Sequence, residues 1–129
     1  MDAPTTTHPV STWMPAGANS EHSAAGAALE DLQRETFGYF LHETNPANGL
    51  VLDKNAPDWP ASIAATGLAL ACYPVAVERG FMSRSAAALR TLTTLRFFWH
   101  SPHGPEADAT GYQGFYYHFL DMRSGRRAC

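Results

Sequence analysis

The stretch "SIAATGLALACYPVAVERG", residues 62–80, decides the fold class of this chain. Ser62 is a preferred N-cap residue, and Gly80 is a preferred residue just beyond a helix C-terminus. Between these two signals and before the charged end, only Thr66 and Tyr73 carry a polar group. Since a helix that is apolar on every side is a buried one, the sequence predicts a helix that is buried all round.

This apolar helix is not expected to cross a membrane. A membrane span needs about 20 predominantly apolar residues, and Gly67 and Pro74 interrupt this one. Pro74 is also expected to kink the helix, because proline removes a backbone donor. A core that surrounds a whole helix needs more neighbouring elements than this chain supplies, which indicates a fragment of something longer.

Two amphipathic helices are predicted on either side of it. Residues 23–44 carry apolar side chains at helical spacing and are expected to end near Thr44, because Pro46 disfavours helix in the residue before it. Its apolar face consists of Leu29, Leu32, Phe37, Phe40 and Leu41. The other helix opens after the N-cap candidate Ser83 and ends before Pro102. Its apolar stripe is Ala88, Leu92, Leu95 and Trp99, widened by Leu89 and Phe98.

The stretch "GYQGFYYHFLDMRSG", residues 111–125, predicts a short β-hairpin near the C-terminus. If residues 114–121 are extended, their side chains alternate between two faces of one strand. "MRSG" then supplies a turn in which Gly125 is free to take a positive φ, and "RRAC" begins the returning strand. The sequence therefore predicts an all-α chain with one small β element.

Composition excludes several partners and chemistries. The 129 residues suffice for one modest domain, and a net charge of −3 offers no basic stripe for nucleic acid. Cys72 lies in an apolar run and Cys129 ends the chain, so no disulfide framework is expected. His100 and His103 lie on either side of Pro102, which breaks the helix between them, so they cannot present metal ligands from one helix face. No metal and no cofactor are expected.

Residues 1–22 are interpreted as a flexible leader, because they are rich in Pro, Thr and Ser and show no periodicity. The leader has neither the positive start nor the continuous apolar run of a secretory signal, so a cytoplasmic location is the default expectation. A periplasmic or secreted location follows if the true N-terminus differs. The domain is expected to occupy residues 23–129.

The order of motifs along the chain resembles the glucoamylase-like (glycoamylase) family. A helix is followed by a loop with Asp53 and Lys54, a buried helix ending "YPVAVERG", a helix ending "TLRFFW", and then "GPEADATGYQGFYYHFLDMRSGRR". The resemblance covers residues 29–128, and its most specific parts are "PVAVERG", "LRFFW" and "GFYYHFLDM" with the following "SG" and arginine. The family includes endo-β-1,2-glucanases, and a related domain occurs in cyclic β-1,2-glucan synthases.

The resemblance implies an (α/α)6 six-hairpin barrel with an apolar inner ring and an amphipathic outer ring. This chain would supply the N-terminal part of the barrel, with residues 62–80 as an inner-ring helix. The missing remainder of the barrel is then an expected partner. The further acidic motifs that the family carries in later helices are absent from this chain.

Asp121, at the end of "YYHFLD", is the first candidate for a catalytic carboxylate. Cleavage of a glycosidic bond needs an acid that protonates the leaving oxygen and a carboxylate that activates water or attacks the sugar. Asp121 fits equally well a turn-capping role, in which its side chain accepts hydrogen bonds from the backbone amides of "MRSG". Glu106 and Asp108 lie in a polar loop and are expected to be solvated.

Candidate substrate-binding residues are mainly aromatic, because aromatic rings stack on the apolar faces of sugars. The expected platforms are Trp59, Tyr112, Tyr116 and Tyr117, whereas Phe98, Phe115 and Phe119 are expected in the core. Asp53 is expected either to hold a sugar hydroxyl or to form an exposed ion pair with Lys54. His118 is expected either to hydrogen-bond a hydroxyl or to serve a structural role.

Two classes of function follow. In the first, the full-length parent is an inverting glycoside hydrolase with two carboxylates that acts on β-glucan, with β-1,2-glucan favoured by the resemblance. In the second, this chain is a catalytically incomplete helical fragment that binds only carbohydrate or a partner. A glucan-trimming domain of a cyclic glucan synthase is a further alternative. The chain alone is expected to be inactive.

Overall fold

The computed structural model describes residues 18–128, with side chains from residue 23 onward. The chain divides into two compact units, Met1–Gln33 and Arg34–Cys129. The described residues are mostly helical and add two small antiparallel strand pairs. The predicted helical class with a small β element is therefore confirmed. Most of the predicted leader, and Cys129, lie outside the described residues.

Helix α1 (Ala18–His42) begins inside the segment that was predicted as a leader. In the first unit the side chains of residues 23–32 are all exposed, including those of Leu29 and Leu32. In the second unit the last turns of α1 bury Phe37 and Phe40. The predicted apolar face of this helix is thus buried only over its second half.

Helix α2 (Ile63–Glu78) has the predicted caps. The Ser62 hydroxyl accepts hydrogen bonds from the Ala64 and Ala65 amides at 3.2 and 3.4 Å, and Gly80 takes a φ of 70° after the last turn. The buried side of the helix carries Thr66, Ala69, Tyr73 and Ala76. In the described chain α2 is not buried all round, since Leu68 and Val75 are 56% and 58% exposed. This agrees with the expectation that the chain supplies too few neighbouring elements to surround the helix.

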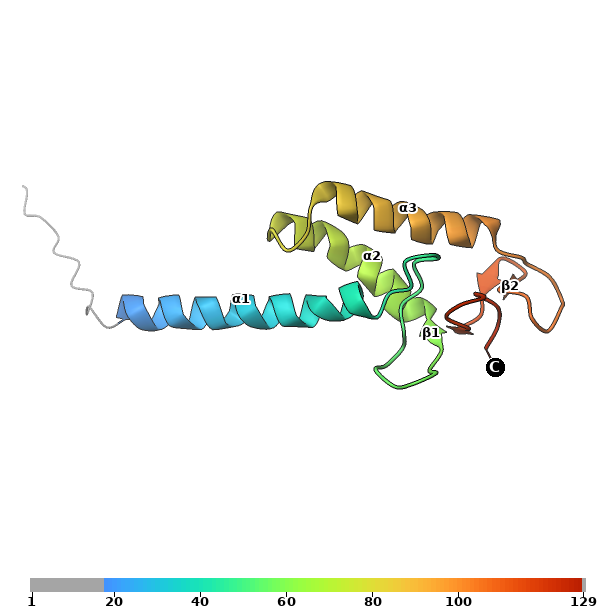
Figure 1. The fold of residues 1–129 in the computed structure, drawn as a ribbon, viewed down its shortest axis with the longest axis horizontal. Coiled ribbons are helices and arrows are strands. Elements are labelled where there is room, and N and C mark those ends of the chain that lie inside the picture. The colour runs from blue at the N-terminus through green and yellow to red at the C-terminus, as the bar shows by residue number, and fades with distance from the viewer. Residues whose placement is uncertain (1–17, 129) are drawn as a thin grey trace, which may run out of the picture. The chain divides into compact units, whose positions relative to one another are not determined.

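Helix α3 (Arg84–His100) runs back alongside α2 (Figure 1). Ser83 caps it, since its hydroxyl accepts from the Ala86 amide at 3.2 Å. Its buried residues are Ala87 and Thr94. Most of the predicted apolar stripe faces solvent in the described chain, including Leu92 and Trp99, whereas Phe98 is half-buried. The helical period is confirmed, but the described chain leaves most of this apolar face uncovered.

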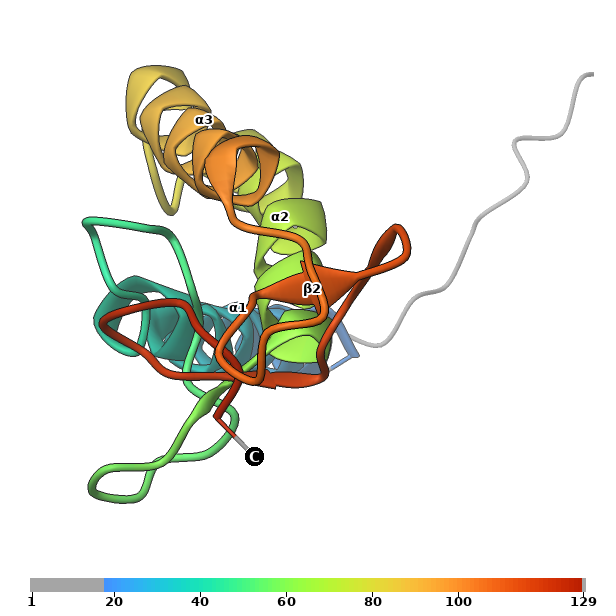
Figure 2. The ribbon, with the colours of Figure 1, turned by 90° about the vertical axis from the view of Figure 1, so that its right-hand side faces the viewer.

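The strands are shorter than predicted and belong to two pairs. β2 (Gly111–Tyr112) pairs with β3 (Phe115–Tyr116) across a tight turn, and β4 (Phe119–Leu120) pairs with β1 (Ala61–Ser62). The single extended strand predicted over residues 114–121 is therefore wrong, because the chain changes partner between β3 and β4. The C-terminal segment reaches the start of α2, where the Ile63 amide donates to the His118 carbonyl at 3.1 Å (Figure 2).

The turn after β4 follows the prediction. Gly125 takes a φ of 70°, and Arg127 forms an antiparallel bridge with Leu120. The Ala128 amide also donates to the Phe119 carbonyl at 3.0 Å. The returning strand predicted for "RRAC" is thus present as a bridge.

Two hydrophobic clusters stabilise the second unit. One joins the end of α1 to α2 and contains Phe37, Phe40 and Tyr73. The other contains Leu50, Ala61 and Leu120, all fully buried, with Phe97, Phe98 and Met122 packed against it. Of the predicted site residues, Tyr117 packs against this second cluster. Among the described residues, no helix has the length and apolar character needed to cross a membrane.

Candidate functional site

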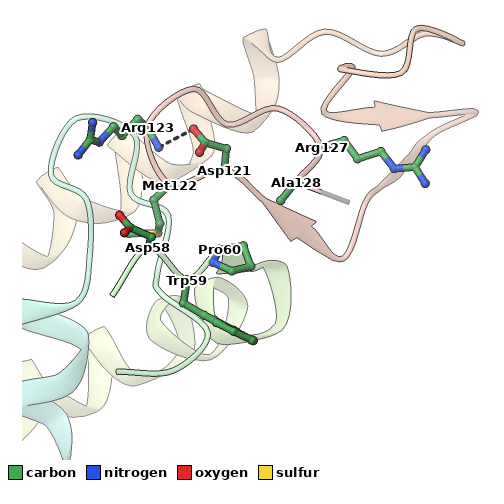
Figure 3. A pocket seen from close by; sticks show the side chains of 8 residues that line it. All are labelled: Asp58, Trp59, Pro60, Asp121, Met122, Arg123, Arg127 and Ala128. Carbon is green, nitrogen blue, oxygen red and sulfur yellow. Dashed lines mark hydrogen bonds between the residues drawn. The ribbon is translucent and has the colours of Figure 1, made fainter. Parts of the chain in front are cut away.

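The candidate site is a pocket between a loop and a turn that lie far apart in the sequence (Figure 3). The loop supplies Asp58, Trp59 and Pro60, and the turn supplies Asp121, Met122, Arg123, Arg127 and Ala128. We refer to these eight residues as the loop–turn pocket. It brings together two of the predicted site residues, Trp59 and Asp121.

Two asparagine side chains position the turn. The side-chain amides of Asn45 and Asn48 both donate to the Met122 carbonyl, at 2.6 and 3.0 Å. Asn48 is buried, and its Oδ1 accepts from the Leu50 amide at 3.0 Å. The turn at residues 121–125 is therefore tied to the segment that follows α1.

The Asp121 carboxylate has the turn-capping geometry. Its Oδ1 accepts from the Arg123 amide at 3.1 Å, from the Ser124 amide at 2.7 Å and from the Ser124 hydroxyl at 2.8 Å. The hydrogen bond from the Ser124 amide, followed by that from the Ser124 hydroxyl, lowers the pKa of Asp121 below its usual value. The carboxylate is therefore ionised near neutral pH, which suits a base or an acceptor of hydroxyl groups and does not suit a general acid.

The Trp59 indole is held by its neighbours in the loop. Its Nε1 donates to the Asp53 carboxylate at 3.3 Å, and the Lys54 ammonium lies 3.5 Å from the ring centroid. Asp53 and Lys54 thus both contact the ring. Figure 3 shows the Trp59 ring and the Asp121 carboxylate pointing in different directions, so the pocket offers an aromatic surface and a charged edge as separate features.

The same loop has an unusual backbone conformation at Asp58, whose carboxylate belongs to the pocket. Asp58 has a φ of 55°, in the left-handed region that few side chains adopt. Closure of the loop accounts for this conformation, since the Asp53 amide donates to the Pro60 carbonyl at 3.0 Å and the Trp59 amide to the Ala56 carbonyl at 3.3 Å. Such outliers often occur at binding sites, and here the strained residue lines the pocket.

The remaining predicted residues lie outside the pocket lining. Tyr116 is structural: its hydroxyl donates to the Phe98 carbonyl at 2.9 Å, and its ring contacts Phe98 and His103. Tyr112 lies exposed at the β2–β3 hairpin. Tyr117 lies beneath the Arg127 guanidinium, 4.5 Å from its ring centroid.

His118 is exposed and meets Phe119 edge-on, with ring centroids 4.4 Å apart. Of the residues expected in the core, Phe98 is half-buried, whereas Phe115 is 79% exposed at the hairpin. The expectation of a core position for Phe115 is therefore wrong, because β3 pairs with β2 in the hairpin. Asp108, which was expected to be solvated, pairs with Arg126 at the surface.

Sequence reasoning did not select Asp58, Arg123 and Arg127 as site residues, although all three line the pocket. The signal for Asp58 was its place between Pro57 and Trp59 in a polar loop. No local signal pointed to the two arginines, because their position follows from the long-range bonds to Met122.

Within residues 23–128, no group of three or more histidine, cysteine or acidic side chains could hold a metal ion. Cys72 is a half-buried free thiol in α2. Neither a protein-family model, nor a curated protein, nor a solved structure matches the chain.

Proposed function

We propose that this chain binds a β-glucan at the loop–turn pocket, as part of a glycoside hydrolase of the glucoamylase-like kind. The observation that supports it is the shared pocket of Trp59, an aromatic platform, and two carboxylates, Asp58 and Asp121. Indole rings suit the apolar faces of sugars, and carboxylates accept hydrogen bonds from their hydroxyl groups. β-1,2-Glucan is the favoured substrate because of the family resemblance.

The barrel is part of the same proposal. α2 leaves Leu68 and Val75 exposed on the side away from its buried residues. In an (α/α)6 barrel α2 is an inner-ring helix, and the other inner helices cover that side. Exposed apolar surface of this kind favours association, which supports the expected remainder of the barrel as a partner.

A binding role without catalysis is the second candidate. The hydrogen bonds of Asp121 Oδ1 favour it, because that oxygen is already engaged by the Ser124 and Arg123 groups. Glycosidic cleavage also needs an acid with a raised pKa, and Asp121 has the opposite shift. In this reading the chain supplies a sugar subsite, and the catalytic acid lies in another part of the parent.

The test is calorimetric titration of the chain with linear β-1,2-glucooligosaccharides. Trp59→Ala is expected to weaken binding at least about tenfold, as loss of a stacking platform would. Trp99→Ala is the matched control, since Trp99 is exposed on α3 and does not line the pocket. Equal affinity for wild type and Trp59→Ala, or no binding at all, would reject the pocket as a glucan site.

Reducing-sugar release by the parent protein separates the two candidates. Loss of release in Asp121→Asn, with oligosaccharide binding intact, favours the hydrolase with Asp121 as a catalytic residue. Unchanged release in that variant leaves Asp121 with its turn-capping role and favours the sugar subsite.

A further inference from the structure

Helix α3 presents an apolar surface to solvent and a polar residue to the interior. Its outer face carries the exposed side chains of Leu89, Leu92, Leu95 and Trp99, the last of them 83% exposed. On the opposite side Thr94 is buried, and its hydroxyl donates to the Gly49 and Arg90 carbonyls. We call the four exposed residues the α3 outer face. Soluble proteins rarely leave such a row uncovered, so it marks an interaction surface.

The charge on α3 limits which partner fits. The helix contains three arginines, Arg84, Arg90 and Arg96, and no acidic residue. Arg96 follows Leu92 by four positions, so it lies beside the α3 outer face, and both Arg84 and Arg96 are exposed. A symmetric contact between two α3 helices would bring like charges together, which is unfavourable. The partner should therefore be an apolar row with acidic flanks.

The same chain contains such a surface. Residues 23–36 of α1 carry Leu29 and Leu32, three positions apart and 55% and 59% exposed. Glu35, three positions after Leu32, lies beside this row, and Asp31 lies one turn before Glu35; both are exposed. An acidic leucine row on α1 and a basic leucine row on α3 are complementary in both apolar character and charge.

We propose that the acidic segment of α1, residues 23–36, in one copy binds the α3 outer face of a second copy. In a two-fold dimer each copy gives one segment and receives one, so the contact forms twice and buries twice the area. This pairing is independent of glucan binding. It also leaves the exposed side of α2 unoccupied, because α3 packs on α2 with its buried side and turns the outer face away.

The dimer is tested by sedimentation equilibrium of the full chain with two double variants. Asp31→Lys with Glu35→Lys makes both surfaces basic, and Arg84→Glu with Arg96→Glu makes both acidic. Each double variant alone is expected to dimerise at least about tenfold more weakly than wild type, and an equimolar mixture of the two is expected to restore dimers. Arg79→Glu is the control, since Arg79 is exposed at the end of α2. Circular dichroism verifies that every variant is folded.

Three results would overturn the proposal. The first is a wild-type chain that stays monomeric at all concentrations. The second is a pair of double variants that dimerise as well as wild type or gain nothing on mixing. The third is a monomeric chain that binds phosphatidylserine vesicles, with Leu92→Lys abolishing that binding, which would assign the α3 outer face to an anionic lipid surface instead.

Discussion

The side-chain amide of Asn48 donates to the backbone carbonyl of Met122, 74 residues later, at 3.0 Å. Asn48 is buried, and its Oδ1 accepts from the Leu50 amide at the same distance of 3.0 Å. One side chain thus satisfies two backbone groups and fixes the turn that carries Asp121 against the segment after α1. The geometry of the loop–turn pocket depends on this link.

Replacement of Asn48 by aspartate should destabilise the fold. The variant keeps an acceptor for the Leu50 amide but faces the Met122 carbonyl with an oxygen. That carbonyl then keeps only the hydrogen bond from Asn45, and a buried carboxylate oxygen meets another acceptor without a donor, at a cost of about 1–3 kcal/mol. Urea unfolding at neutral pH measures the loss. Asn55→Asp is the matched control, because Asn55 is exposed in the neighbouring loop. Equal unfolding midpoints for the two variants would contradict the role given to Asn48.

Asp121 should make stability depend on pH in the acid range. Its pKa is lowered in the folded state, first by the Ser124 amide, so its contribution is complete above the unfolded value of about 3.9 and is lost as pH falls through the lower folded value. Wild type should therefore be more stable than Asp121→Ala at pH 6, with the difference shrinking at pH 3. Denaturant midpoints at both pH values measure it. A stability difference that grows on acidification would show that folding does not lower the pKa of Asp121.

The parts of the fold that local chemistry determines could be predicted from the sequence. Ser62 and Ser83 cap their helices as expected, and Gly80 and Gly125 take positive φ values where helix and turn end. Each depends on a few neighbouring residues. These features follow from hydrogen bonds that a residue makes within its own turn.

Features that depend on distant partners were missed. Leucines at helical spacing on α3 gave the period, but which face is buried depends on distant partners: Ala87 packs in the cluster with α2, and Thr94 packs against Gly49. The prediction of one strand over residues 114–121 was wrong because β4 pairs with β1, which lies far away in the sequence. Trp59 and Asp121 were both selected from sequence, yet their shared pocket results from the bonds to Met122, which no local pattern encodes.

Substitution of Gly49 by alanine should be among the most destabilising changes in the chain. Gly49 has a φ of 76°, and a Cβ there would lie 2.8 Å from the Thr94 Cα, so backbone strain adds to a clash that side-chain rotation cannot relieve. The left-handed conformation alone costs about 1–2 kcal/mol for an L-residue. Gly80→Ala is the control, since Gly80 has a φ of 70° and nothing within 4 Å of its Cβ position. Thermal unfolding should rank Gly49→Ala clearly below Gly80→Ala, and the reverse order would contradict the close approach of Thr94.

Removal of the Tyr73 hydroxyl should leave the protein as stable as before or make it more stable. Tyr73 is fully buried in the cluster with Phe37, and among the described residues its hydroxyl has no hydrogen-bond partner. Burying an unsatisfied polar group costs about 1–3 kcal/mol, so Tyr73→Phe removes a penalty while keeping the ring. Tyr39→Phe is the matched comparison and should cost about 1 kcal/mol, because the Tyr39 hydroxyl donates to the Leu52 carbonyl at 2.7 Å. Urea unfolding of both variants gives the two values, and a Tyr73→Phe variant less stable than Tyr39→Phe would mean that the Tyr73 hydroxyl has a partner in solution.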